Sequence, residues 1–271
     1  MELIHTLLLL IRENSRELDL EMSGRCLGSL EKSAYKTVII FNQGCLTNED
    51  LAQYLKQFKL DCEIIGSGTN TGTVVGRQGC FEHVYERFPD AEFISELHPD
   101  MIFASDWENA LIDYLKANED EPVIGCGIVS DPKITEYYPN DIDTFLAPFK
   151  SNRVERGFTL PCVHKTEVLK AVGGYDARFL KGMQAFEDDS LLLAYHYYYG
   201  TRANWIPKIN YNSVVYHAVG GQRFELSDDL YANFDGLVKK YGAMGLNALA
   251  NIHVSPWQVD FFSDKFSLMR E

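Results

Sequence analysis

Short apolar runs alternate with amphipathic stretches along the first half of the chain. The run LIHTLLLLIR over residues 3–12 has the length of a strand, and similar runs follow over 37–41 and 62–66. Between them, residues 18–30 and 47–58 carry apolar side chains at helical spacing. Strands that are apolar on both faces are typical of a parallel sheet covered by helices. The pattern therefore predicts three buried strands joined by two helices.

The alternation continues to about residue 129. A helix is expected over 81–88, a strand over 91–97, a helix over 107–115 and a strand over 122–129. We therefore predict an α/β fold built on a Rossmann-like, doubly wound mixed sheet. Ligands of such sheets bind in the crevice beyond the carboxyl ends of the strands.

The second half of the chain is more polar and less regular. After a polar loop that begins near residue 130, the pattern predicts a helix at Leu191 and a strand that ends at His217. Because no low-complexity linker separates the halves, we expect a single domain. Residues 224–271 are predicted to form a helical C-terminal extension packed on that domain. The pattern assigns no role to its aromatic tail.

The composition is that of a protein that buries its own core. Hydrophobic residues make up 46% and charged residues 24% of the chain, which excludes disorder and fibrous repeats. The formal net charge of −14 repels phosphate backbones, so no binding to nucleic acid is expected.

The cysteines and the first apolar run indicate the cellular compartment of the protein. The six cysteines are far apart and form no CxxC pair, which favours buried free thiols over a zinc ribbon or a disulfide framework. The apolar run over 7–11 is too short to span a bilayer and has no cleavage site after it. We expect a cytoplasmic protein without a transmembrane segment.

Polar and glycine-rich segments follow several of the predicted strands. Asn14, Asn42 and a glycine loop over 66–79, which carries five glycines, fall at strand exits together with the segment that starts at His98. Glycines let the backbone of such a loop approach a ligand closely. Arg77, in this loop, is the cation best placed to meet a diphosphate, although a surface ion pair would account for it equally well.

The triplet His98-Pro99-Asp100 follows a buried strand. Its two metal-competent side chains can face one ion, and Mg²⁺ or Mn²⁺ commonly binds one or two carboxylates beside phosphate and water. His217, at the end of a later strand, is a candidate third ligand. A capped turn at Asp100 and an ordinary buried histidine at 217 are the structural alternatives.

Three adjacent acids, Glu187-Asp188-Asp189, precede a predicted helix. One of them can cap the helix N-terminus, where negative charge is favourable. Mutual repulsion also raises the affinity of one carboxylate for a proton, as a general base requires. The pattern fits a cap and a catalytic base equally well.

The segment Gly173-Gly174-Tyr175-Asp176 follows a predicted helix and indicates a tight turn. Its glycines also allow the main chain to approach an acceptor molecule. A tight turn and an approach of the main chain to an acceptor are compatible with each other at this segment.

The order of these segments resembles the family 2-like glycosyltransferases of the GT-A fold over about residues 3–220. In the first half, LLLLIREN, RCLGSL and VIIFNQG resemble the family's first strand, helix and second strand. Asn70-Thr71-Gly72 resembles its N-x-G segment. FISELHPDM places the HPD triplet where the family has Asp-x-Asp, with an aromatic residue, Trp107, heading the next helix.

The second half resembles the family more specifically. VHKTEVLKAVGGYDARF, FEDDSLL and VVYH are similar to the family's acceptor-side GG[YF]D, ED-x-D-L and terminal histidine, in the same order. The departures are His98 for the first metal-site aspartate, FNQG for the acidic nucleotide turn and Ser190 for the last acid of ED-x-D.

The resemblance implies donor, metal and acceptor sites in one cleft. For the nucleotide sugar it implies Asn14, Asn42, Asn70, Gly72, Arg77 and Asp100. For Mn²⁺ or Mg²⁺ it implies Asp100, with His98 and His217. For the acceptor it implies Trp107, Gly173, Gly174, Glu187 and Asp189, with Asp188 as the catalytic base.

The implied activity is inverting transfer of a sugar from a UDP-, GDP- or dTDP-sugar to a hydroxyl of a saccharide or lipid-linked acceptor. Residues 1–129 would bind the donor and 130–223 the acceptor, within one glycosyltransferase domain over 1–223. A lipid-linked acceptor would bring the protein into peripheral contact with the inner membrane face.

Two other functions fit part of the pattern. A nucleotidyltransferase could use a related sheet, but its usual glycine-rich, basic phosphate loop is missing from LLLLIREN. A catalytically silent protein that binds carbohydrate or nucleotide is also compatible, because several motif residues are replaced.

Overall fold

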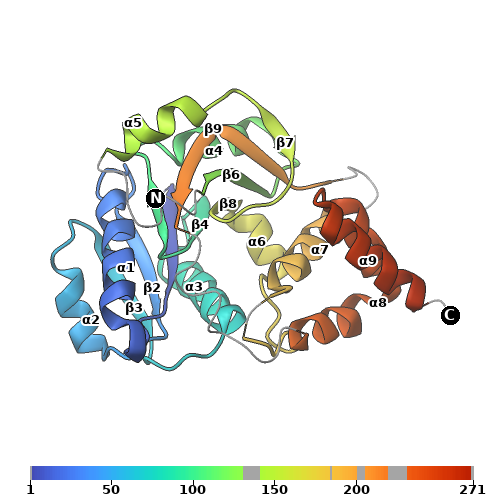
Figure 1. Cartoon of the computed structure of the whole chain (residues 1–271), viewed down its shortest axis with the longest axis horizontal. Helices are drawn as coiled ribbons and strands as arrows, with labels where there is room; N and C mark the ends of the chain where they lie inside the picture. The colour runs from blue at the N-terminus through green and yellow to red at the C-terminus, as the bar shows by residue number, and fades with distance from the viewer. Residues whose placement is uncertain (1, 131–140, 184, 200–204, 219–230, 270–271) are drawn as a thin grey trace.

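The computed structural model describes residues 2–130, 141–183, 185–199, 205–218 and 231–269, and these form one mixed α/β domain (Figure 1). Its single sheet has nine strands in the order β3-β2-β1-β4-β8-β6-β9-β5, with β7 paired to β9. The strands are β1 Leu3–Leu9, β2 Thr37–Asn42, β3 Asp61–Gly66, β4 Phe93–Leu97, β5 Met101–Phe103, β6 Val123–Val129, β7 Val154–Arg156, β8 Cys162–Lys165 and β9 Lys208–His217.

The first four strands of the order run parallel to one another, and β6 runs parallel to β9. Strand β8 pairs antiparallel with both β4 and β6, and so joins the two parallel groups. The predicted doubly wound mixed sheet is therefore present. Strands β2 and β4 are almost entirely buried, as expected for central strands covered on both faces.

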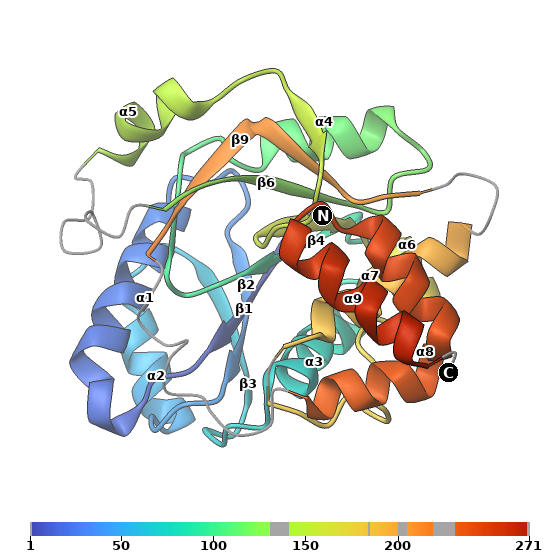
Figure 2. The same cartoon turned by 45° about the vertical axis from the view of Figure 1, so that its right-hand side comes forward.

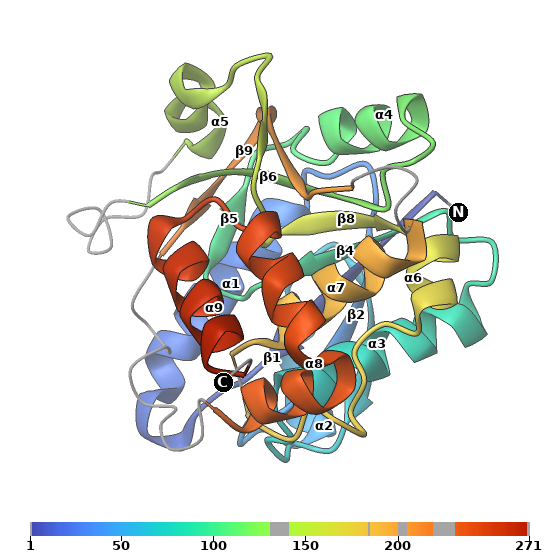
Figure 3. The same cartoon turned by 90° about the vertical axis from the view of Figure 1, so that its right-hand side faces the viewer.

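Helices cover both faces of the sheet and continue beyond it. They are η1 Glu13–Ser15, α1 Arg16–Leu30, α2 Asn48–Leu55, α3 Thr73–Arg87, α4 Asn109–Ala117, α5 Ile142–Leu146, η2 Ala147–Phe149, α6 Thr166–Val172, α7 Glu187–Tyr199, α8 Ala232–Ile252 and α9 Pro256–Leu268. Figures 2 and 3 show α8 and α9 side by side and next to α7, at the side of the molecule away from α1 and α2.

The glycine-rich segment differs from the prediction. Only its first part is a loop, because α3 begins at Thr73, after Gly72 with φ of 86°. A Cβ on Gly76 would lie 2.2 Å from Leu8 Cδ1, and one on Gly79 would lie 2.8 Å from Phe41 Cε2. These two glycines therefore serve to bring the helix close to β1 and β2, and do not form a loop around a ligand.

The sequence predicted the turn after β4 and the helical C-terminal extension, but not their details. The turn expected over 98–101 leads directly into β5, which pairs with the end of β9. The C-terminal extension is helical as predicted, with α8 interrupted at Gly242, where φ is 61° and ψ is −162°. The predicted boundary at residue 223 lies outside the described residues.

All six cysteines are free thiols, and four of them are buried. Among the described residues, no helix is long and apolar enough to cross a bilayer.

Gly44 and Gly28 offer a matched test of the packing that shapes the cavity edge. Gly44 follows β2, in a turn held to the end of β1 by a hydrogen bond from Cys45 N to Ile11 O of 2.7 Å. A Cβ on Gly44 would lie 2.4 Å from Ile11 N, whereas one on Gly28 in α1 would meet nothing within 4 Å.

We expect Gly44→Ala to destabilise the protein by about 2 kcal/mol or more, because backbone must move to admit the methyl group. Gly28→Ala should stabilise it by about 0.5–1 kcal/mol through helix propensity. Urea denaturation midpoints measure both changes. Equal midpoints for the two variants would contradict this account of the turn.

Candidate functional site

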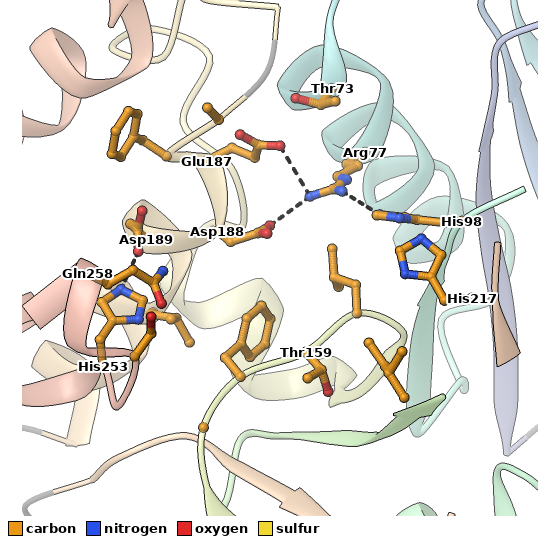
Figure 4. Close-up of a pocket in the computed structure, with 18 of the residues that line it drawn as sticks. Thr73, Arg77, His98, Thr159, Glu187, Asp188, Asp189, His217, His253 and Gln258 are labelled. Atoms are coloured by element: carbon orange, nitrogen blue, oxygen red, sulfur yellow. Dashed lines mark hydrogen bonds and ion pairs between the residues drawn. The ribbon is translucent and has the colours of Figure 1, made fainter. Parts of the chain in front are cut away.

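A cavity of about 930 Å³ opens at the carboxyl ends of the central strands. Its wall combines segments that are far apart in the sequence: strand exits near residues 98–100 and 217, helix α3, the start of α7 and the C-terminal residues 252–258. Figure 4 shows side chains from these segments facing one another across the cavity. The sheet edge that the sequence predicted as the ligand site is therefore hollow.

An imidazole and carboxylate cluster, formed by His98, Asp100 and His217, lies on one side of the cavity. One ligand atom from each residue lies within 4.8 Å of the others. His98 and Asp100 follow β4, and the pairing of β5 with β9 brings His217 opposite Met101. His217 Nε2 lies 3.1 Å from Asp100 Oδ2. Residues almost 120 positions apart thus meet through one antiparallel strand pair.

The protonation states of this cluster favour cation binding. Burial and the nearby charge of Arg77 lower the pKa of His98 to about 3. Burial disfavours the ionised form of Asp100, but the hydrogen bond and charge of His217 outweigh it and hold the pKa of Asp100 below its usual value. At neutral pH the cluster therefore offers one carboxylate and a neutral His98 imidazole.

Arg77, on α3, lies at the centre of the site and joins its two sides. Its Nη2 lies 2.9 Å from His98 Nε2, and its Nη1 donates to Asp188 Oδ1 at 2.7 Å. Its Nε lies 3.1 Å from Glu96 Oε1, and Nη1 is 3.7 Å from Glu187 Oε1. Figure 4 shows the guanidinium between the two groups of side chains. One buried cation thus contacts three carboxylates.

One positive charge cannot neutralise three carboxylates, and the pKa values reflect this imbalance. Burial and the charge of Asp188 raise the pKa of Glu187 to about 7. Burial also raises the pKa of Asp188, against the effect of Arg77. For Glu96, burial alone would raise the pKa, but the charge of Arg77 together with hydrogen bonds from His164 and Tyr175 lowers it below its usual value. The sequence predicted that Arg77 contacts a diphosphate. In the structure its guanidinium contacts three carboxylates.

Asp188 is the most accessible of the three carboxylates that contact Arg77. Its side chain is 36% exposed, whereas those of Glu96 and Glu187 are buried. Tyr175 OH lies 3.2 Å from Asp188 Oδ1 but 2.8 Å from Glu96 Oε1, and it has only one proton to donate. The fixed partner of Asp188 Oδ1 is therefore Arg77, at 2.7 Å. The carboxylate is therefore both oriented and open to the cavity.

The backbone before the three acids is strained. Ala185 and Phe186 have positive φ angles of 70° and 60°, which non-glycine residues rarely adopt. Asn233 Nδ2 of α8 donates to Ala185 O at 2.9 Å, and the Phe186 ring packs against Phe234 and Phe261. The C-terminal helices therefore hold a strained turn that directs Glu187, Asp188 and Asp189 into the cavity.

The C-terminal segment also forms part of the cavity wall. His253 Nε2 lies 2.6 Å from Asp189 Oδ1, and the His253 ring stacks on Phe262 with a centroid distance of 5.4 Å. The guanidinium of Arg156 donates to the backbone oxygen of His253 at 3.2 Å. The sequence analysis assigned no role to this segment. Its aromatic residues were the only signal that it docks on the body.

The structure brings eight of the predicted site residues to the cavity and leaves six elsewhere. Those that line it are Asn70, Arg77, His98, Asp100, Glu187, Asp188, Asp189 and His217. The six that do not are Asn14, Asn42, Gly72, Trp107, Gly173 and Gly174.

Trp107 and the glycine pair have structural roles in place of the expected acceptor contacts. The Trp107 side chain is wholly buried and packs on Phe103, with ring centroids 4.8 Å apart. Gly173 ends α6 in the left-handed conformation, with φ of 83°. A Cβ on Gly174 would lie 2.3 Å from Gln78 Oε1. The glycines thus cap a helix and admit a neighbouring side chain.

The expected nucleotide contacts are also partly displaced. Asn42 is buried and donates to Leu46 O at 2.9 Å, so it holds the turn after β2, and the next residue, Gln43, lines the cavity. Asn14 is exposed on η1, and Gly72 forms the N-terminal cap of α3. These residues shape the cavity edge without lining it.

Glu96 and Gln43 were missed in the sequence analysis. A charged residue inside the strand FISEL was the available signal for Glu96, since a buried carboxylate requires a partner. Gln43 carried no comparable signal.

Comparison with known proteins gives structural similarity only. No family model matches the chain, and no curated protein matches it by sequence. The structure of S. aureus TarS superposes with a TM-score of 0.59 at 11% identity, over 98% of this chain and 43% of that one. The chain thus spans less than half of TarS.

Shorter TarS structures, of residues 1–349, were solved with ligands. The complex with UDP-GlcNAc has a TM-score of 0.57 at 13% identity and covers 99% of this chain and 72% of that one. The UDP complex has a TM-score of 0.59 at 12% identity and covers 98% and 70%. Together with the mixed sheet, the similarity confirms the predicted fold class, a single-domain α/β fold of GT-A type.

Glu187 provides a test of the charge imbalance around Arg77. Because folding raises its pKa from 4.5 to about 7, the folded state binds the proton more tightly, and stability is lost as pH rises through this range. We expect Glu187→Gln to stabilise the protein at pH 8 by on the order of 1–3 kcal/mol, and to have little effect at pH 4.5.

Thermal unfolding at the two pH values measures this difference, which corresponds to a shift of about 2–4 °C per kcal/mol. Glu86→Gln, at an exposed position of the same helix as Arg77, is the matched control and should change neither midpoint. If Glu187→Gln were no more stable than the wild type at pH 8, ionisation of Glu187 would not lower the free energy of unfolding, and this account of the charge imbalance would be wrong.

Proposed function

We propose that this protein transfers a sugar from a nucleotide-diphosphate sugar to a hydroxyl of an acceptor. The observation that carries the proposal is a single cavity in which Asp188 and the cluster of His98, Asp100 and His217 lie on either side of Arg77. Structures of this fold, those of TarS, hold UDP-GlcNAc and UDP. UDP-sugars are therefore the donors to test first.

The cluster would hold the divalent cation that such a donor requires. Its three ligand atoms lie within 4.8 Å, and a mixed set of imidazole and carboxylate suits Mn²⁺. The hydrogen bonds from Arg77 to His98 and from His217 to Asp100 use the same atoms. An ion would therefore displace the Arg77 N–H from His98, and His217 would bind it only with Nε2 unprotonated. A bound Mn²⁺ or Mg²⁺ would neutralise charge on the departing diphosphate.

The charge of the cavity supports a requirement for such a cation. Among the described residues that line it, four are acids, namely Asp100, Glu187, Asp188 and Asp189, and Arg77 is the only lysine or arginine. Arg77 already contacts three carboxylates. A diphosphate would therefore meet net negative charge in this cavity unless a cation entered with it.

Asp188 is the residue we assign as general base. Its raised pKa brings proton affinity closer to the working pH, which improves a base of this type. Arg77 fixes one oxygen of the carboxylate while the side chain remains accessible. It would accept the proton of the acceptor hydroxyl as that oxygen attacks the anomeric carbon. Attack from the face opposite the diphosphate inverts this centre.

Asp188→Asn tests the assignment of the base. We expect turnover of the UDP-sugar to fall about 10²- to 10⁴-fold, because the amide cannot accept the proton. The affinity for UDP should change little. Transfer and slow hydrolysis of UDP-GlcNAc, followed by UDP release with Mn²⁺ present, provide the measurement.

Asp260→Asn, at an exposed position of α9, is the control and should retain wild-type turnover. Wild-type turnover in Asp188→Asn would remove Asp188 from the mechanism. Binding of nucleotide sugars without turnover in the wild type, across donors and acceptors, would favour the catalytically silent alternative. Release of pyrophosphate from UTP and a sugar phosphate would favour a nucleotidyltransferase.

Asp100→Asn tests the cation site separately. We expect it to weaken Mn²⁺-dependent binding of UDP at least tenfold, since it removes the carboxylate of the cluster. Calorimetry with and without EDTA measures the effect, and Asp113→Asn on α4 serves as the exposed control. Equal UDP affinity with and without EDTA would exclude a cation-dependent donor site.

A further inference from the structure

We propose that the C-terminal segment 252–258 forms a saccharide subsite in which a pyranose ring stacks on Trp257. The inference rests on the proposed function only in identifying this saccharide as the acceptor. The sugar-binding surface itself follows from the cavity wall.

The cavity has two chemically different ends. One end carries Arg77 and the cluster of His98, Asp100 and His217, and the other carries residues 252–258 (Figure 4). The cavity volume of about 930 Å³ lies near the upper end of the range for small-ligand sites, about 300–1,000 Å³. Asp188 lies between the two ends, where a base must meet the acceptor hydroxyl.

Trp257 combines exposure with a fixed position. Its side chain lines the cavity, yet it is 66% exposed, the highest value among the exposed aromatic residues of the described chain. One face stacks on Phe261 with a centroid distance of 5.7 Å and an interplanar angle of 22°. Phe261 in turn stacks on Phe186, at 5.7 Å and 24°. These stacked rings tie Trp257 to the residue that precedes the acids of α7.

The surroundings of Trp257 suit a sugar. A pyranose presents C–H groups on its faces and hydroxyls at its edge, so it needs an aromatic plane next to polar side chains. Ser255 and Gln258 of the same segment line the cavity, and His253 pairs with Asp189 at 2.6 Å. An exposed indole bordered by amide, hydroxyl and carboxylate groups meets this need.

Other occupants fit the surface less well. An anionic lipid surface would be repelled by the acids of this cavity and by the net charge of −14. A second copy of the chain carries the same charge. A neutral saccharide does not meet this repulsion.

Acrylamide quenching of tryptophan fluorescence tests the subsite directly. The chain has three tryptophans, and Trp107 and Trp205 are buried, so quenching reports on Trp257. Cellotetraose and chitotetraose are the probes, because their β-linked rings present flat C–H faces, and no nucleotide is added. We expect either saccharide to reduce quenching and sorbitol to leave it unchanged. Unchanged quenching with both saccharides, up to their solubility limits, overturns the proposal.

Variants assign the binding to Trp257. Trp257→Ala should weaken binding of the saccharide about tenfold, measured by calorimetry, and Trp257→Phe should retain most of the affinity. Tyr198→Ala, an exposed aromatic residue of α7 outside the cavity lining, is the matched control and should bind as the wild type does. Equal affinity of Trp257→Ala and wild type overturns the assignment.

Binding of UDP-GlcNAc with Mn²⁺, measured on the same variants, separates this inference from the proposed function. Trp257→Ala should leave the affinity for UDP-GlcNAc unchanged. If the folded variant lost this affinity, Trp257 would belong to the donor site and the proposal of a separate subsite would be overturned. A wild type that binds the saccharides but no UDP-sugar would refute the donor proposal and leave the subsite standing. A wild type that binds UDP-GlcNAc but neither saccharide would support the donor proposal and refute the subsite.

Discussion

The contacts of the Arg77 guanidinium organise the whole site. This side chain is buried between Glu96 on the sheet and Glu187 and Asp188 on α7, and it also reaches His98. Without a cation at this point, three carboxylates would face one another in a low-dielectric interior, at a cost of several kcal/mol for each unpaired charge. Arg77 thus links the sheet to the start of α7 within the site.

That arrangement separates two kinds of chemistry that the proposed reaction needs. On the sheet side, neutral imidazole and an ionised carboxylate provide ligands for a cation. On the helix side, burial raises the proton affinity of Glu187 and Asp188. Since Arg77 contacts both sides, binding of a cation or an anion near His98 changes the electrostatic environment of Asp188. In the proposed reaction, Arg77 would therefore couple the donor side of the site to the acceptor side.

The strands and the order of the motifs could be predicted because hydrophobic periodicity and turn chemistry depend on neighbouring residues. The wrong predictions concern features that depend on residues distant in the sequence. The pattern places Trp107 at the start of a helix, and in the structure it lies two residues before α4. Whether its ring faces the core or a ligand depends on Phe103 and the rest of the core against which it packs. Glycines 76 and 79 indicated a loop, yet they pack a helix against Leu8 and Phe41, which is a tertiary contact. The pairing of His253 with Asp189 across 64 positions had no local signal.

The strained turn before α7 ties the order of synthesis to the assembly of the site. Ala185 and Phe186 are held in their unusual backbone conformation by Asn233, Phe261 and Phe262, so the restraint is encoded far downstream of the acids it positions. A nascent chain that has not yet released residues 233–262 from the ribosome lacks the contacts that hold this turn. The acidic wall of the cleft therefore depends on residues synthesised after all nine strands of the sheet.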